Sequence, residues 1–320
     1  MQTHDSLGRR FPNHITAPDK TLVIHRAREQ MLQRLDWFVA LPNHHLKAYL
    51  HNFGIIKEQN KVATLTDLAS KDFGDNYIWR NPLQLPDNAG GWVPRSHSYV
   101  SELGAKGITH LKKQKLYIGN KRTSGFFHEL TCSITLSEIE LATMETDDIT
   151  FMPRHMVTKF PNGYPVTIDR NGKEKYTELR DDGFFQLDYI GRKRVHFVEL
   201  DLSNEQLKGN LNGKKTVERM LRQWSIFLRR PTKGGRSLFS EIFNLDMPAV
   251  VHFRFISEQR MKNAIDLLMS ITDKKGDPNI LFDFDTRFRR GQYQAPNVSH
   301  DFFHKEHLRA GRPPVRIDGI

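Results

Sequence analysis

Apolar residues recur at helical and then at strand-like spacing along the first third of the chain. Residues 26–41 place Met31 and Leu35 on one face, which is the pattern of an amphipathic helix. Pro42 interrupts this pattern, and Asn43 follows as a residue that can cap a second, shorter helix. The remaining segments of this region are a third helical stretch and two strand-like runs, at 64–73, 76–83 and 92–103.

This order of three helices and a hairpin is that of a winged helix-turn-helix, which places its third helix in the major groove of DNA. Residues 99–107 resemble the strand and helix start that close many winged helices. We therefore expect a flexible tail at 1–20 and a winged helix-turn-helix DNA-binding domain at 21–122.

Beyond residue 122 the pattern changes to helices and strands that alternate. Helices are predicted at 124–144, at 213–229 and after Ser257, which can cap the last of them. Strands are predicted at 148–152, 181–188, 195–201, 249–256 and 280–284. The segment 160–179 is predicted to be a loop or a loose hairpin. The order describes an α/β domain at 123–290, a mixed sheet flanked by helices, and then a basic, extended tail at 291–320.

The two strands at 181–188 and 195–201 carry acids at one end of a predicted hairpin. Glu199 and Asp201 share one face of their strand, because residues two apart point the same way. The turn brings Asp181 or Asp182 back beside them. Carboxylates that converge in this way suit Mg²⁺ or Mn²⁺ as hard oxygen ligands. The alternative is that the acids form an ordinary polar strand end.

Positive charge is clustered, and the chain of 320 residues has a net charge of +11. Basic residues far outnumber acids in two blocks, 104–122 and 206–236, which is typical of a protein that binds a polyanion such as nucleic acid. The alternative is a solvated basic surface. The candidate DNA-binding residues are Lys71, Arg95, Lys106, Lys112, Lys113, Lys208, Lys214, Arg219 and Arg222.

Several classes of protein and site are excluded by composition. The single cysteine, Cys132, rules out an internal disulfide and a cysteine-based zinc site. No apolar run reaches the roughly 18–20 residues of a membrane span, and residues 1–20 lack the apolar stretch of a signal peptide, so we expect a cytoplasmic protein without a membrane partner. The glycines at 119–125 and 234–235 do not form a phosphate-binding loop, and no nucleotide hydrolysis is expected.

The order of elements around the acidic hairpin resembles the PD-(D/E)XK nuclease superfamily, which implies a restriction-endonuclease-like sheet and cleavage of DNA. In this resemblance Asp182 and Glu199 match the metal-binding acids, with Asp201 as a further metal ligand. Asp201 also occupies the position at which the superfamily has its catalytic lysine. Lys215 or Arg219 could supply that cation from the following helix. A further acid could come from the leading helix, as Glu129 or Glu138.

More specifically, the chain resembles the replication-relaxation family of plasmids and other mobile elements. The resemblance is carried by YVSELGAKG, by FFHELTCSITLSEIELA, by DDGFFQLDYIGRKRVHFVELDLSNE with KKTVERMLRQWSIF, and by AVVHFRFISEQRMKNAIDLL, in that order. It implies DNA as a partner, together with other replication or mobilisation proteins. It also implies a role in plasmid replication, DNA relaxation or mobilisation.

Two functional hypotheses follow from the sequence. In the first, the chain is a metal-dependent DNA nuclease or nickase in which Asp182, Glu199, Asp201 and Lys215 are catalytic. In the second, the same fold has an inactive site and serves as a DNA-binding accessory or replication-initiation factor. A third, more distant hypothesis is an RNA-binding regulator, which would need exposed aromatic side chains for stacking.

Overall fold

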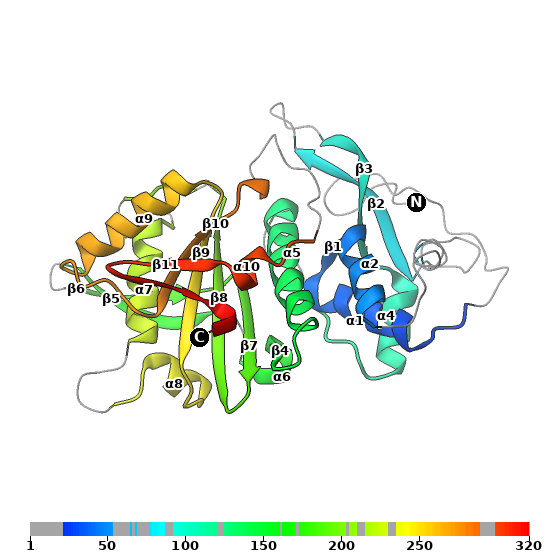
Figure 1. The fold of residues 1–320 in the computed structure, drawn as a ribbon, viewed down its shortest axis with the longest axis horizontal. Coiled ribbons are helices and arrows are strands. Elements are labelled where there is room, and N and C mark those ends of the chain that lie inside the picture. The colour runs from blue at the N-terminus through cyan, green and yellow to red at the C-terminus, as the bar shows by residue number, and fades with distance from the viewer. Residues whose placement is uncertain are drawn as a thin grey trace. The chain divides into compact units, whose positions relative to one another are not determined.

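The protein folds into two compact units in a computed structural model (Figure 1). The first unit contains residues 1–145 and 293–300, and the second contains residues 146–292 and 301–320. The structure describes residues 22–53, 65, 68, 77–86, 92–120, 125–160, 162–170, 173–202, 205–209, 215–229, 235–288 and 298–319.

Helices surround a small antiparallel sheet in the first unit. The sheet has the strand order β1-β3-β2. The elements described in this unit are α1 (Arg26–Phe38), β1 (Ala40–Pro42), α2 (Asn43–Asn52), β2 (Ile78–Pro86), β3 (Trp92–Leu103), α4 (Ala105–Lys113) and α5 (Phe126–Thr143). The predicted helix at 64–73 lies largely outside the described residues. Only its Leu65 and Leu68 are described, and both are helical and buried.

The long helix α5 belongs to the first unit, although the sequence pattern grouped it with the α/β domain that follows. Its apolar side chains are buried beside α1, α2 and β1. Glu140 on α5 accepts a hydrogen bond from Arg34 at 2.6 Å and another from the Tyr49 hydroxyl at 2.7 Å. These buried polar contacts and the apolar packing place the boundary after Glu145 rather than at residue 122.

A seven-stranded mixed sheet is the centre of the second unit, with the order β12-β11-β10-β9-β8-β7-β4. Its elements are β4 (Ile149–Pro153), α6 (Arg154–Val157), β5 (Tyr164–Arg170), β6 (Lys173–Leu179), β7 (Gly183–Tyr189), β8 (Arg192–Asp201), α7 (Val217–Leu228), α8 (Leu238–Phe243), β9 (Ala249–Phe255), α9 (Glu258–Ile271), β10 (Ile280–Phe284), α10 (Asp301–His304), β11 (Glu306–Arg309) and β12 (Arg312–Arg316). The predicted mixed α/β sheet flanked by helices is confirmed.

Strand directions divide the large sheet into three parts. β4, β7 and β8 run antiparallel, β8, β9 and β10 run parallel, and β11 and β12 return antiparallel. Parallel neighbours need a crossover connection, and α7 and α9 provide the two that are required here. As a result, the carboxyl ends of β8, β9 and β10 lie at one edge of the sheet.

The main hydrophobic core lies between this sheet and the helices α7 and α9 (Figure 1). Phe197 of β8 contacts Trp224 and Phe227 of α7 with ring centroids 4.7 and 5.8 Å apart. Phe253 on β9 and Met261 on α9 belong to the same cluster. The β5–β6 hairpin, which the sequence left open between a loop and a hairpin, also packs there, and its Tyr164 stacks on Phe227.

The opposite face of the sheet buries polar rings. His196, His252 and His307 are each fully buried, and a ring nitrogen of His196 lies 2.9 Å from one of His252. Phe302 of α10 contacts both His252 and His307. Side chains alternate between the two faces of a strand, so residues two apart in β8 and β9 point to this face of the sheet.

The C-terminal segment forms regular structure, in contrast to the extended tail that its composition indicated. Phe302 and Phe303 are buried under the sheet, and β11 pairs with β10. Gly311 takes a φ of +67°, which permits the tight turn into β12. The prolines of β12 lie at the sheet's edge, where a missing N–H costs no ladder hydrogen bond. Within the described residues, no helix is long and apolar enough to cross a membrane.

Acid should destabilise the protein through the histidines of the second sheet face. Burial lowers the pKa of His307 to about 4 and lowers the pKa of His196 and His252 as well. These histidines therefore bind protons near pH 6.5 in the unfolded chain but not in the folded one. Each histidine then lowers the free energy of unfolding by up to about 1.4 kcal/mol per pH unit below that value.

Urea denaturation between pH 4.5 and 7.5 tests this expectation. His307→Gln removes one titrating group, so its stability should fall less steeply with decreasing pH than that of the wild-type protein. Exposed His51 provides the control variant, His51→Gln. Equal slopes for His307→Gln and the wild type would show that His307 does not carry this pH dependence.

Candidate functional site

The acidic end of the β7–β8 hairpin is fixed by backbone pairing. Gly183 lies opposite Val198, and the N–H of Asp182 donates to the carbonyl of Val198 at 2.9 Å. The N–H of Leu200 in turn donates to Oδ2 of Asp182 at 2.7 Å. The Asp182 carboxylate is therefore held at the carboxyl end of β8, next to Glu199.

Glu199 is buried, with 1% of its surface exposed, and both of its oxygens accept hydrogen bonds. The indole N–H of Trp224 donates to Oε1 at 2.9 Å, and the ammonium of Lys215 lies 3.3 Å from Oε2. Trp224 reaches Glu199 from the core face of α7. The Lys215 ammonium comes from the segment that follows the hairpin.

Capping explains why Lys215 lies at this point. The hydroxyl of Thr216 accepts a hydrogen bond from the N–H of Arg219, so Thr216 is the N-cap and α7 begins at Val217. The N–H groups of Val217 and Glu218 donate to the carbonyls of Gln206 and Leu207. Lys215 thus stands just ahead of the helix on a segment tied to the end of β8.

The charges of this cluster are coupled. Burial raises the pKa of Glu199, while the Lys215 ammonium opposes that rise and the Asp182 carboxylate adds to it. Partial desolvation lowers the pKa of Lys215, but the carboxylates of Glu199, Asp182 and Glu205 outweigh it and raise that pKa overall. Several carboxylates therefore stabilise the charged form of Lys215, whose side chain is 45% exposed.

Asp201 shares the face of Glu199, as the strand pattern predicted, but it lies against a different cation. Its Oδ2 accepts a hydrogen bond from Nε of Arg260 on α9 at 2.7 Å. Arg260 also donates to the carbonyl of Glu205.

Asp181 is buried next to Arg154 and accepts a hydrogen bond from the Tyr164 hydroxyl at 2.5 Å. Of the four acids at this end of the hairpin, Asp182 and Glu199 are thus the two that raise the pKa of Lys215.

The oxygen donors of Asp182 and Glu199 suit a hard divalent cation. Among the described residues, no group of three or more histidine, cysteine, aspartate or glutamate side chains is arranged to hold a metal ion. Mg²⁺ in nucleic-acid enzymes is commonly held by one or two carboxylates, with water and substrate phosphates completing its shell. If a divalent cation bound here, Asp182 and Glu199 are the carboxylates that would hold it, with water and phosphate oxygens completing its shell.

Several predicted DNA-binding residues lie on α4 of the first unit. The ammonium groups of Lys106 and Lys112 stand over the rings of Tyr77 and Tyr117, at 5.3 and 5.1 Å from the centroids. Lys113 is exposed in the last turn. Lys71 lies outside the described residues. Arg95 lies on β3, and its side chain is outside the described part.

The other predicted DNA-binding residues surround the start of α7. Lys208 is exposed, and Lys214 lies outside the described residues. Arg219 is partly buried in the first turn of α7. Arg222, one turn later, forms an ion pair with Glu218 at 3.0 Å.

The acids considered on the leading helix, Glu129 and Glu138, both lie on α5 of the first unit. Oε1 of Glu138 accepts a hydrogen bond from the N–H of Ser299, and it lies 3.7 Å from a ring nitrogen of His45. The backbone of Glu129 accepts a hydrogen bond from the Ser133 hydroxyl. The contacts that Glu138 makes within its own unit give it a structural role.

Sequence reasoning missed Trp224 and Arg260 as parts of the acidic site. Trp224 lies on the apolar face of α7, and an apolar position of this kind indicates only a core residue. A buried indole N–H nevertheless requires an acceptor, and this requirement was a signal that a buried acid lay within reach. Arg260 carries no comparable signal, because its spacing on α9 resembles that of any solvent-facing residue.

Removal of the Arg260 guanidinium should destabilise the second unit. Arg260→Met leaves the buried carboxylate of Asp201 without this cation, which should lower the free energy of unfolding by about 3 kcal/mol. Lys262→Met is the matched control, because Lys262 is exposed on the same helix and pairs with Glu258. The control should change stability by less than about 1 kcal/mol in urea denaturation. Equal losses in the two variants would contradict a structural role for the Arg260–Asp201 pair.

No family model, curated protein or solved structure matches the chain. The roles of Asp182, Glu199 and Lys215 therefore rest on the contacts described above.

Proposed function

We propose that the chain is a DNA-binding protein that cleaves or nicks DNA with Mg²⁺ or Mn²⁺ at the end of the β7–β8 hairpin. The observation that carries this proposal is the position of the Lys215 ammonium, 3.3 Å from Glu199 and electrostatically coupled to Asp182. Two acids and a lysine are the residue types that the PD-(D/E)XK resemblance requires. Lys215 would supply the cation that is absent from the position of Asp201.

The order of elements supports the same proposal. The antiparallel strands β4, β7 and β8 are followed by α7 and by β9, which runs parallel to β8. The sequence resemblance implied this order, with Asp182 at the start of one strand and Glu199 near the end of the next. The proposed core is therefore the restriction-endonuclease-like sheet.

Each residue has a physical role in the proposed reaction. A divalent cation held by Asp182 and Glu199 would lower the pKa of a bound water and stabilise charge on the phosphate. Trp224 orients the Glu199 carboxylate through its indole N–H. Lys215, which is partly exposed, directs a positive charge to the place where negative charge develops on a phosphodiester.

DNA binding is proposed for the first unit as a winged helix-turn-helix. Its three-stranded sheet joins β1, β3 and β2, and α4 follows directly with its lysines. The net charge of +11 favours a polyanionic partner. With the sequence resemblance, these features support a role in replication, relaxation or mobilisation of a mobile element, alongside other proteins of that process.

A second candidate function is DNA binding without cleavage. It is favoured by the burial of Glu199, whose two oxygens already accept hydrogen bonds from Trp224 and Lys215. It is also favoured by the pairing of Asp201 with Arg260. In this case the acidic cluster would serve to hold α7 and α9 on the sheet.

Cleavage of supercoiled plasmid in the presence of Mg²⁺, Mn²⁺ or EDTA tests the proposed reaction. Metal-dependent nicking is expected for the wild-type protein. Nicking should fall to background in Glu199→Gln, Asp182→Asn and Lys215→Met, because each change removes a metal ligand or the activating cation. DNA affinity should persist in all three variants.

Glu241→Gln is the control for cleavage, because Glu241 is an exposed glutamate on α8 of the same unit. It should nick DNA at the wild-type rate. Intact but retarded plasmid with the wild-type protein and both metals would overturn the nuclease proposal and favour the second candidate.

The salt dependence of DNA binding tests the role of α4. The logarithm of the binding constant should fall linearly with the logarithm of salt concentration, with a slope of about −0.9 per phosphate neutralised. Lys112→Ala combined with Lys113→Ala should make the slope shallower by about 1–2. Lys262→Ala on α9 serves as the control and should leave it unchanged. A flat dependence for the wild-type protein would contradict both candidate functions.

A further inference from the structure

A cavity of about 960 Å³ lies at the end of the sheet opposite the acidic cluster. β8 and β9 are parallel, with Val195 opposite Ala249 and Glu199 opposite Phe253. The cavity is lined by Ala249 at the amino end of β9, whereas Glu199 lies at the carboxyl end of β8. This cavity is therefore separate from the proposed cleavage site.

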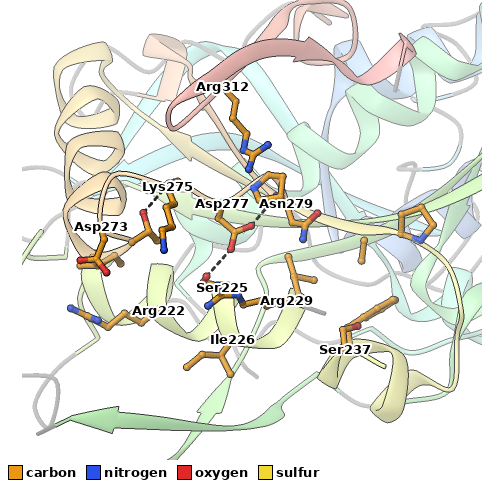
Figure 2. A pocket seen from close by; sticks show the side chains of 18 of the residues that line it. Arg222, Ser225, Ile226, Arg229, Ser237, Asp273, Lys275, Asp277, Asn279 and Arg312 are labelled. Carbon is orange, nitrogen blue, oxygen red and sulfur yellow. Dashed lines mark hydrogen bonds between the residues drawn. The ribbon is translucent and has the colours of Figure 1, made fainter. Parts of the chain in front are cut away.

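Three parts of the second unit line the cavity with basic side chains (Figure 2). Arg222 and Arg229 come from α7 and its end, Lys275 from the turn after α9, and Arg312 from β12. Arg222 is paired with Glu218. In the part of the chain that the structure describes, Arg229, Lys275 and Arg312 form no ion pair with a carboxylate. The four cations of the lining exceed its two carboxylates, Asp273 and Asp277, and this excess favours a ligand that carries negative charge.

Hydrogen-bond acceptors are held in place between these cations. Oδ2 of Asp277 accepts a hydrogen bond from the Ser225 hydroxyl at 2.6 Å, and Oδ1 accepts one from the N–H of Asn279 at 2.9 Å. Figure 2 shows both contacts as dashed lines among the side chains that line the cavity. Asp277 is buried, so its position is set by α7 and by its own loop. Fixed acceptors of this kind suit the hydroxyl groups of a sugar or the amino groups of a base.

Apolar side chains complete the lining. Ile226, Met247, Pro248 and Ile271 contribute to the wall, and Ile226 is 39% exposed, although it is a large hydrophobic residue on α7. An exposed apolar surface inside a basic cavity favours a ligand with a flat, poorly hydrated part beside its charged part. A heterocyclic base attached to phosphate groups has this character.

The walls of the cavity are tightly packed against one another. Gly276 has a φ of +61°, and a Cβ at this position would lie 2.0 Å from the carbonyl oxygen of Ala310. The turn that carries Lys275 and Asp277 therefore packs directly on the β11–β12 hairpin that carries Arg312. This close approach of two backbones fixes the positions of Lys275 and Arg312 relative to each other.

We propose that this cavity binds a nucleoside di- or triphosphate. Its volume lies near the upper end of the roughly 300–1,000 Å³ range that is typical of small-molecule sites. Arg229, Lys275 and Arg312 contact the phosphates, Asp277 accepts from the sugar or the base, and Ile226 packs against the base. The proposal concerns binding only, and it is independent of the proposed nuclease activity.

Isothermal titration of the full-length protein with ATP and GTP tests this site, with adenosine and inorganic pyrophosphate as partial ligands. At least one of the two nucleotides should bind, and more tightly than adenosine or pyrophosphate. Arg312→Ala and Lys275→Ala should each weaken binding by about 10-fold or more, because each removes a charge-assisted contact to phosphate. The thermal unfolding midpoint of each variant establishes that it is folded.

Lys274→Ala is the matched control, since Lys274 is the exposed neighbour of Lys275 and does not line the cavity. It should bind as the wild type does. Absence of nucleotide binding at millimolar concentration would overturn the proposal, as would equal weakening by Lys274→Ala and Lys275→Ala. Binding of a single-stranded oligonucleotide that is weakened by Arg312→Ala and Lys275→Ala, together with no binding of free nucleotide, would also overturn it, because the cavity would then contact DNA.

Discussion

The parallel pairing of β8 with β9 is the constraint on which the rest of the second unit depends. It runs in register from Val195 and Ala249 to Asp201 and Phe255. A parallel pair requires a crossover, and α7 supplies it by returning across the sheet face that bears Phe197. This crossover brings Lys215 and Trp224 to Glu199. It also places Arg229 at the carboxyl end of the same helix, beside the cavity, so that one connection reaches both ends of the sheet.

The second unit buries several charged side chains. Glu199, Asp201 and Arg254 are almost fully buried, and each lies against a partner of opposite charge. Such pairs contribute little net stability, because desolvation offsets most of the attraction. They do make misplacement costly, since a strand register shifted by one residue would leave each buried charge without its partner. The pairs therefore favour a single arrangement of strands and helices.

Much of the second unit could be predicted from periodicity, because its core strands and helices are strongly patterned. The strand Ile280–Phe284 and the helix capped by Ser257 occur where the pattern placed them. The shared face of Glu199 and Asp201 also followed from the period of two. Their different partners could not be predicted, since Lys215 and Arg260 reach them from separate elements across the fold.

Elements that depend on long-range contacts were missed for the same reason. The basic, proline-containing C-terminal segment has the composition of an extended tail, yet Phe302 and Phe303 anchor it and the edge of β10 provides a partner for β11. Likewise α5 has the pattern of a buried helix, but its packing on α1, α2 and β1 and the partners of Glu140 determine which unit buries it. Local sequence reports that a segment is buried, and tertiary contacts decide where.

The path of the chain has a consequence for how the two units can be separated. Residues 293–300 belong to the first unit, whereas residues 301–320 return to the second. Neither unit is therefore a continuous piece of the chain, and a cut after residue 145 does not yield two complete parts. A fragment that ends at residue 292 lacks β11 and β12, and it exposes the edge of β10 to pairing with other chains. The last twenty residues thus protect the sheet against aggregation as well as complete it.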